Sequence, residues 1–201
     1  MAGTERLLIE GPVGAIETVL DHPAGAPVGV ALIAHPHPLH GGTLDNKVVQ
    51  TLARTFVELG YLAARPNFRG VGTSAGTHDE GNGETDDLVA VARAVRTRLG
   101  QPDAPLVLAG FSFGSLVQSR VALRVAAQRL VIIGIALTRG HVENVPADTI
   151  LIHGEKDDVV PLDVVMRWAE PQDLPVTVIA GADHFFHRRL HMIRNIIKGA
   201  W

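Results

Sequence analysis

The chain of 201 residues contains no cysteine, which excludes disulfide bonds, thiolate metal sites and a cysteine nucleophile. No run of Lys and Arg exceeds two residues and the formal net charge is −3, so nothing suggests a nucleic-acid surface. Long apolar segments are also missing, because the longest run, 130–137, is far too short to span a bilayer. Residues 1–11 lack the basic region and apolar core of a signal peptide. We therefore expect a soluble cytoplasmic protein that binds neither nucleic acid nor membrane.

The composition that remains is typical of a globular protein, with 46% hydrophobic and 19% charged residues. The length favours one domain, 1–201, with a sizeable core. The sequence leaves the oligomeric state open.

Short apolar runs alternate with longer amphipathic segments, which is typical of an α/β fold with a mostly parallel, doubly wound sheet of about eight strands flanked by helices. The first two strands should form a hairpin around Gly11-Pro12. The expected strands are 7–10, 15–21, 28–34, 61–65, 106–111, 130–136, 149–153 and 175–180. The expected helices are 47–59, 85–99, 115 to about 127, 163–169 and 188–198.

One pentapeptide, Gly-Phe-Ser-Phe-Gly at 110–114, predicts a nucleophile. A serine on a sharp strand-to-helix turn exposes its hydroxyl, and flanking glycines remove the side chains that would crowd it. The following helix directs its N-terminal amides at the same point. The alternative is a glycine-bounded turn in which Ser112 is incidental. The other serines fit the role less well, because Ser115 and Ser119 fall inside a helix and Ser74 in a glycine-rich loop.

A serine nucleophile needs a base and an acid, and both should lie on loops at the carboxyl ends of strands. Asp157 follows the strand 149–153 by one tight turn, with Asp158 as its rival. His184 follows the strand 175–180, although a loop histidine bonded only to backbone is the alternative. The order Ser, Asp, His is that of α/β-hydrolases.

These motifs resemble the α/β-hydrolase superfamily over about 28–191, including His-Gly-x-x-Asp-x-x-Val-Pro at 153–161 and Gly-Ala-x-His at 181–184. His-Pro-His-Pro at 35–38 and Asn-Phe-Arg-Gly-Val-Gly at 67–72 are similar to small, cap-less bacterial serine hydrolases described as carboxylesterase-like. Dienelactone hydrolases resemble the chain less, since their nucleophile is usually a cysteine.

The resemblance implies an oxyanion hole made by the backbone amides of Phe113 and a residue in the loop 35–42. Pro36 and Pro38 have no N–H, so His37 is the best second donor, with Leu39 behind it. His35-Pro36 stands where the family usually has His-Gly.

Only 138–148 separates the sixth and seventh strands, too few residues for a cap domain. We therefore expect an open, shallow site that takes short-chain acyl esters. The candidates to line it are Leu39, Phe111, Phe113, Phe185 and Phe186, of which Phe111 could equally belong to the core.

The leading hypothesis is a serine hydrolase that cleaves small esters with Ser112, His184 and Asp157, and that needs no cofactor or metal. Thioester hydrolysis, amide hydrolysis or acyl transfer could use the same residues, and a non-catalytic binding protein on this fold is a further alternative.

Three other features have simpler structural interpretations. The histidine triplets 35/37/40 and 184/187/191 lack the H-E-x-x-H pattern of a metal site. The glycine-rich stretch 70–76 lacks the last glycine of a dinucleotide fingerprint. Arg69 is expected to hold its loop rather than to bind an anionic substrate.

Overall fold

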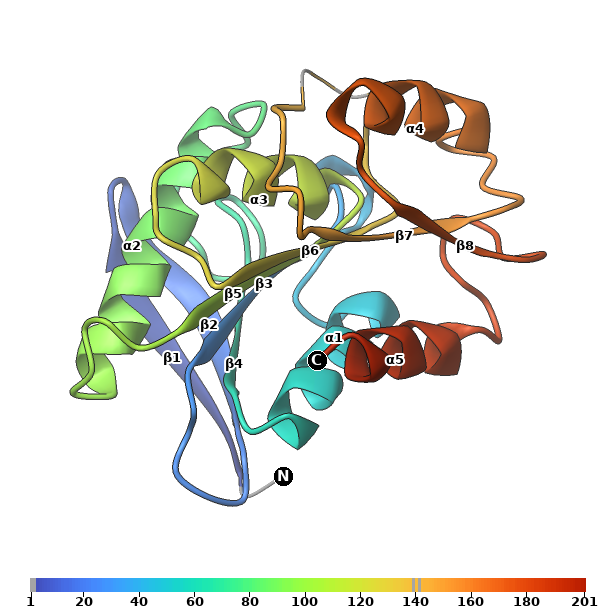
Figure 1. The fold of residues 1–201 in the computed structure, drawn as a ribbon. Helices are drawn as coiled ribbons and strands as arrows, with labels where there is room; N and C mark the ends of the chain where they lie inside the picture. The colour runs from blue at the N-terminus through green and yellow to red at the C-terminus, as the bar shows by residue number, and fades with distance from the viewer. Residues whose placement is uncertain (1–2, 139, 141) are drawn as a thin grey trace.

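The computed structural model describes residues 3–138, 140 and 142–201, which form an eight-stranded sheet covered by helices on both faces (Figure 1). The strand order is β1-β2-β4-β3-β5-β6-β7-β8. The strands are β1 (Gly3–Gly11), β2 (Gly14–His22), β3 (Val30–Ala34), β4 (Leu62–Pro66), β5 (Leu106–Phe111), β6 (Arg129–Ile133), β7 (Ile150–Gly154) and β8 (Val176–Ile179).

The sheet is antiparallel only at its first end, where β1 pairs with β2 and β2 with β4. All other neighbours are parallel. The hairpin, the mostly parallel sheet and the flanking helices confirm the predicted fold class.

The helices are α1 (Lys47–Glu58), α2 (Asn82–Arg98), α3 (Phe113–Ala122), α4 (Leu162–Ala169) and α5 (Leu190–Gly199), with short 3-10 turns η1 (Pro38–His40) and η2 (Glu170–Gln172). Figure 1 shows α1 and α5 on one face of the sheet and α2, α3 and α4 on the other. Alternate residues of the central strands fill the two apolar layers: Leu32 and Leu108 face α2 and α3, whereas Ile33 and Ala109 face α1 and α5.

Several predicted boundaries were wrong by two to five residues. The third helix begins at Phe113 rather than Ser115, because it starts directly after the turn at Ser112. It ends at Ala122 rather than near 127, since the amides of Leu123 and Arg124 bond three residues back and tighten the last turn. The sixth strand stops at Ile133, where Gly134 takes a φ of +52° and turns the chain away.

The connection from β6 to β7 contains no helix or strand in its described part, 134–138, 140 and 142–149, which agrees with the predicted lack of a cap. No helix built from the described residues is long and apolar enough to cross a membrane.

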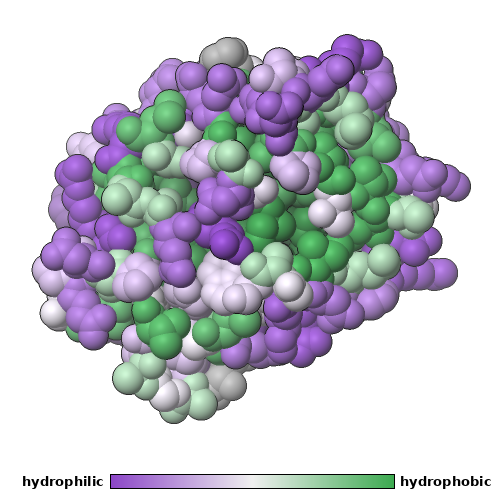
Figure 2. Space-filling model, viewed as in Figure 1, coloured by the Kyte–Doolittle hydropathy of each residue, from purple (hydrophilic) through white to green (hydrophobic). Residues whose placement is uncertain are grey.

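Apolar and polar surfaces are separated on the face seen in Figure 2, which is polar along most of its outline. Apolar side chains gather there between α4 and α5, over the region of β7 and β8. Met166 of α4 and Val178 of β8 are among the exposed large hydrophobic residues. The edge of the sheet at β8 therefore presents considerable apolar surface.

Candidate active site

Ser112 stands between β5 and α3 in a backbone conformation that non-glycine residues rarely adopt, with φ 55° and ψ −118°. Its amide donates to the carbonyl of Ile133 at 2.9 Å, which ties the turn to β6. A Cβ on Gly110 would collide with the backbone of Gly114, and one on Gly114 would collide with that of Ala34. The tight turn therefore requires both glycines of the pentapeptide.

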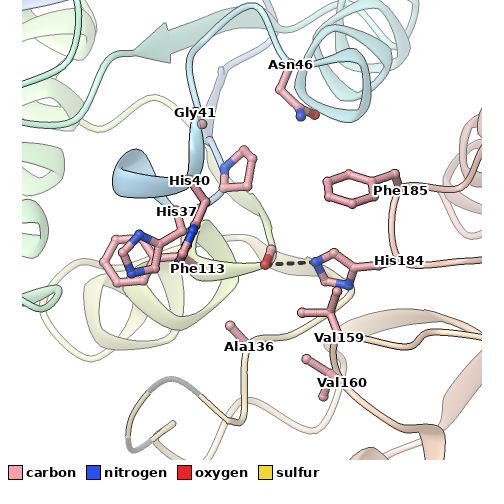
Figure 3. Close-up of a pocket in the computed structure, with 13 residues that line it drawn as sticks. His37, His40, Gly41, Asn46, Phe113, Ala136, Val159, Val160, His184 and Phe185 are labelled. Atoms are coloured by element: carbon pink, nitrogen blue, oxygen red, sulfur yellow. Dashed lines mark hydrogen bonds between the residues drawn. The ribbon is translucent and has the colours of Figure 1, made fainter.

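The structure brings Ser112 together with the predicted histidine and acid; His184 lies 72 residues from Ser112 and 27 from Asp157 along the chain. Nε2 of His184 is 3.0 Å from Oγ of Ser112, the contact drawn as a dashed line in Figure 3. Nδ1 of His184 is 2.7 Å from Oδ2 of Asp157. A carboxylate only accepts, so Nδ1 carries the proton and neutral Nε2 is left to accept from the serine hydroxyl.

The carboxylate of Asp157 is held at both oxygens. The amides of Val159 and Val160 donate to Oδ1 at 2.9 and 2.8 Å, while His184 donates to Oδ2. Burial alone would raise the pKa of Asp157, but the hydrogen bonds from His184 and Val160 outweigh it and lower the pKa. Asp158, the rival acid, is exposed. Asp157 is thus the carboxylate that orients His184.

The two residues predicted to supply the oxyanion amides lie next to each other beside Ser112. Phe113 is the first residue of α3, where a backbone amide has no partner within the helix. The rings of His37 and Phe113 are 4.8 Å apart, and both residues line the cavity beside Ser112. The amide of Leu39, the reserve donor, is occupied by Nδ1 of His37 at 3.3 Å.

His35 fixes the start of the loop that carries His37. Nδ1 of its fully buried ring donates to the carbonyl of Pro36 at 2.7 Å, and Nε2 accepts the amide of Phe68 at 2.9 Å. Burial lowers the pKa of His35 to about 4, against the opposing effect of the Pro36 carbonyl. The ring therefore stays neutral and keeps one tautomer.

Sequence reasoning missed a second histidine–carboxylate pair behind these donors. The ring of His78 lies 4.9 Å from that of His37 and 5.3 Å from that of Phe113. Its Nδ1 is 2.8 Å from Oε1 of Glu84, a fully buried residue in the first turn of α2. No sequence motif marks this pair, since it forms only when the loop before α2 packs on the start of α3.

A cavity of about 300 Å³ opens beside Ser112. In Figure 3, His37, His40 and Phe113 stand on one side, His184 and Phe185 on the other, and three apolar side chains below. The residues that line it are Pro36, His37, His40, Gly41, Gly42, Asn46, Ser112, Phe113, Ala136, Val159, Val160, His184 and Phe185.

Of the predicted lining residues, Phe113 and Phe185 border this cavity, whereas Leu39, Phe111 and Phe186 do not. Phe111 and Phe186 are fully buried in the core layer of α1 and α5. The ring centroids of Phe111 and His184 are 5.1 Å apart, so Phe111 packs against the imidazole and supports it. Leu39 is 71% exposed on η1. The prediction was wrong for Leu39 and Phe186, and Phe111 takes the alternative place in the core, because orientation depends on strand register and loop conformation.

Arg69 has the structural role that the sequence predicts, and two further histidines lie at the surface. Arg69 is buried and donates from two nitrogens to Asp87 and to the carbonyl of Gly83, so it holds the loop 70–81 against α2. His187 bonds to Asp183 on the surface, and His191 is exposed. Within the described part of the chain, no three His, Asp or Glu side chains are grouped as a metal site would require.

A serine elbow between β5 and α3, with an acid after β7 and a histidine after β8, defines an alpha/beta hydrolase. A family described as an alpha/beta hydrolase domain matches residues 29–193. The chain therefore belongs to the alpha/beta hydrolase family, which places it among the hydrolases.

Two solved structures are similar to almost the whole chain. XC6422 from Xanthomonas campestris, an a/b serine hydrolase without lid, is 38% identical with a TM-score of 0.90, over 100% of this chain and 94% of its own. An alpha-beta serine hydrolase homologue from Coxiella burnetii is 39% identical with a TM-score of 0.85, over 96% and 95% of the two chains. The uncharacterized protein RP471 of Rickettsia prowazekii is 31% identical over 96% of this chain and 87% of its own.

Proposed function

We propose that the protein is a serine hydrolase that cleaves short-chain carboxylic esters through an acyl-enzyme on Ser112. The observation that carries the proposal is the hydrogen-bonded series from Oγ of Ser112 through His184 to Asp157, at the edge of a small cavity. The serine hydrolase names of the two similar structures support it.

In the first half of the reaction, Oγ of Ser112 attacks the ester carbonyl carbon while Nε2 of His184 takes the hydroxyl proton. Asp157 stabilises the resulting imidazolium through its bond to Nδ1. The oxyanion accepts hydrogen bonds from the amides of Phe113 and His37. His184 then gives its proton to the departing alcohol oxygen, the carbon–oxygen bond breaks, and an acyl-serine remains.

In the second half, a water molecule attacks the acyl-serine and gives a proton to Nε2 of His184. The second oxyanion accepts hydrogen bonds from the same two backbone amides. Its collapse breaks the bond to Oγ, which takes the proton back from His184, and the carboxylic acid leaves.

The size of the cavity supports short acyl groups. At about 300 Å³ it lies at the small end of ligand pockets, and the short connection from β6 to β7 contains no helix or strand in its described part. Ala136, Val159 and Val160 offer an apolar wall of small side chains for an acyl chain of a few carbons.

The decisive test is intact-mass detection of fluorophosphonate labelling on the wild type, S112A and H184A. One adduct on the wild type and none on either variant would support an activated serine. Absence of an adduct on folded wild type would refute catalysis and favour a binding protein. Nitrophenyl esters of increasing chain length, with matched thioester and amide substrates, then test the substrate class. Activity that peaks at long acyl chains, or on thioesters or amides, would overturn the short-ester proposal.

A further inference from the structure

His153 is a buried histidine that the proposed reaction does not use. It is fully buried in β7, and its Nε2 lies 2.8 Å from the carbonyl oxygen of Val160 and 3.4 Å from Oδ2 of Asp157. Both oxygens only accept, so Nε2 carries the proton. Nδ1 is buried and has no hydrogen-bond partner among the described residues. A polar atom left unpaired in a core calls for an explanation.

The environment keeps this imidazole neutral. Burial lowers the pKa of His153, although the Val160 carbonyl and the charge of Asp157 oppose the shift. A second proton would have to sit on Nδ1, which none of the described residues solvates. His153 is therefore an uncharged N–H donor aimed at the turn that carries Asp157.

One residue, Val160, holds that turn through both its backbone amide and its carbonyl. The amide of Val160 donates to Oδ1 of Asp157, and the carbonyl of the same Val160 accepts from His153. Rotation of the carboxylate would break the first bond, and displacement of the backbone would break the second. The hydrogen bond from His153 therefore limits movement of both the turn and its carboxylate.

We propose that His153 is a positioning residue for the acid of the triad: its Nε2–H anchors the 157–160 turn and faces the carboxylate oxygen that binds His184. The inference rests on the proposed serine hydrolase function. It adds a fourth side chain, one that touches no reacting atom, to the side chains of Ser112, His184 and Asp157.

Few other charges face this carboxylate. His184 approaches from the loop after β8, and His153 from β7. Asp183, beside His184, is engaged by His187. Residues 155, 156 and 158 of the same loop are exposed. Loss of the His153 donor would leave the carboxylate of Asp157 less compensated and would raise its pKa. The charged carboxylate that orients His184 would then be lost at a higher pH, so the acid limb of the pH profile would move to higher pH.

The test compares the wild type with H153L, H153Q and L151A, using kcat and KM for p-nitrophenyl acetate from pH 5 to 9 and Tm. Leucine removes the donor, whereas the glutamine amide can place an N–H close to the position of Nε2. Leu151 is buried on the same face of β7 and belongs to the apolar core, so L151A controls for lost packing.

We expect H153L to lower kcat about tenfold, to change KM less than twofold and to move the acid-limb midpoint up by about 0.5 pH unit. H153Q should recover most of kcat and the wild-type midpoint. L151A should lower Tm without moving the midpoint. A wild-type midpoint and kcat in H153L, or the same midpoint shift in L151A, would overturn the inference. If H153L does not fold, H153N replaces it, since its shorter amide stops short of Val160.

Different results would refute the proposed hydrolase function and the proposed role of His153. A wild type that neither takes the fluorophosphonate nor cleaves esters refutes the proposed function. The position of His153 is then tested by the NMR resonance of the His184 Nδ1 proton, which reports its bond to Asp157. A resonance displaced in H153L and restored in H153Q supports the positioning role, and an unchanged resonance overturns it.

Discussion

Gly134 lies against the ring of His184: a Cβ placed on this glycine would be 3.5 Å from Cε1 of the imidazole and 3.3 Å from Phe111. The glycine also has a φ of +52°, a conformation that glycine adopts without strain. The backbone after β6 therefore forms the wall against which the histidine ring is held.

Replacement of this glycine should impair turnover more than stability alone explains. We expect G134A to lower kcat about tenfold, because the added methyl group crowds Phe111, and Phe111 packs against the ring of His184. G100A is the matched control: Gly100 has a φ of +67° and no atom within 4 Å of an added Cβ, so it carries the strain without the contact. Each strained alanine should cost about 1–2 kcal/mol of stability, measured by chemical denaturation. Equal kcat values in G134A and G100A would show that the close contact of Gly134 with Phe111 and His184 does not affect turnover.

The two neighbouring aspartates should differ sharply in their effect on rate. Asp157 binds His184 and two backbone amides, whereas Asp158 is exposed. We expect D157N to lower kcat by about 10³–10⁴-fold, since an amide does not stabilise the imidazolium or fix its tautomer. D158N should stay within about twofold of the wild type, as an exposed substitution does. The measurement is ester hydrolysis at about pH 7.5. A large loss of kcat in D158N would make Asp158 the acid instead.

The free energy of unfolding should decrease as the pH is lowered, because of the titration of His35. Its pKa is about 4 in the folded protein, below the ordinary histidine value of 6.5, so the unfolded chain binds more protons between these values. The contribution of His35 to stability is therefore fully present above pH 6.5 and is lost as the pH falls toward 4. The contribution lost between about pH 7 and pH 5 is about 2 kcal/mol.

The variant H35Q isolates that contribution. Its side-chain oxygen can still accept the amide of Phe68 but does not titrate. Urea unfolding at about pH 7, 6 and 5 should show a smaller loss of stability for H35Q than for the wild type. Parallel pH dependence in the two proteins would mean that His35 titrates normally in the folded state.

The apolar side chains near the site should separate into those that bind substrate and those that do not. Phe185 lines the cavity and is 47% exposed, so a bound substrate can cover it. We expect F185A to raise KM for short nitrophenyl esters about fivefold, as loss of about 1 kcal/mol of apolar contact would. L39A removes a side chain that is 71% exposed and outside the cavity, and KM should not change. A KM that rises in L39A instead would place the substrate over η1.

The sequence predicts the fold and the grouping of the triad residues well because both depend on order along the chain. Ser112, Asp157 and His184 each follow a strand, and parallel strands bring their carboxyl ends to one edge. No three-dimensional detail is needed for that inference. The short connection after β6 likewise excludes a cap by length alone.

The parts that sequence reasoning missed depend on which way a side chain points. Phe111 and Phe186 look like pocket residues by position, yet the register of β5 and a φ of +52° at Phe186 turn them into the core. His153 appears in the sequence only as part of a motif, and its contact with Asp157 requires the folded turn. His78 reaches Phe113 across a long stretch of chain, which no periodicity reveals.

The site draws its groups from loops after β3, β5, β7 and β8, so that its parts are spread from His37 to His184. During synthesis the nucleophile emerges long before its base, and a chain that ends before the last strand carries a serine with nothing to activate it. Under the proposed function, reactivity at Ser112 therefore marks a chain that is complete and folded. The amount of fluorophosphonate adduct would then measure the number of complete, correctly folded chains, because unfinished chains would not react with the probe.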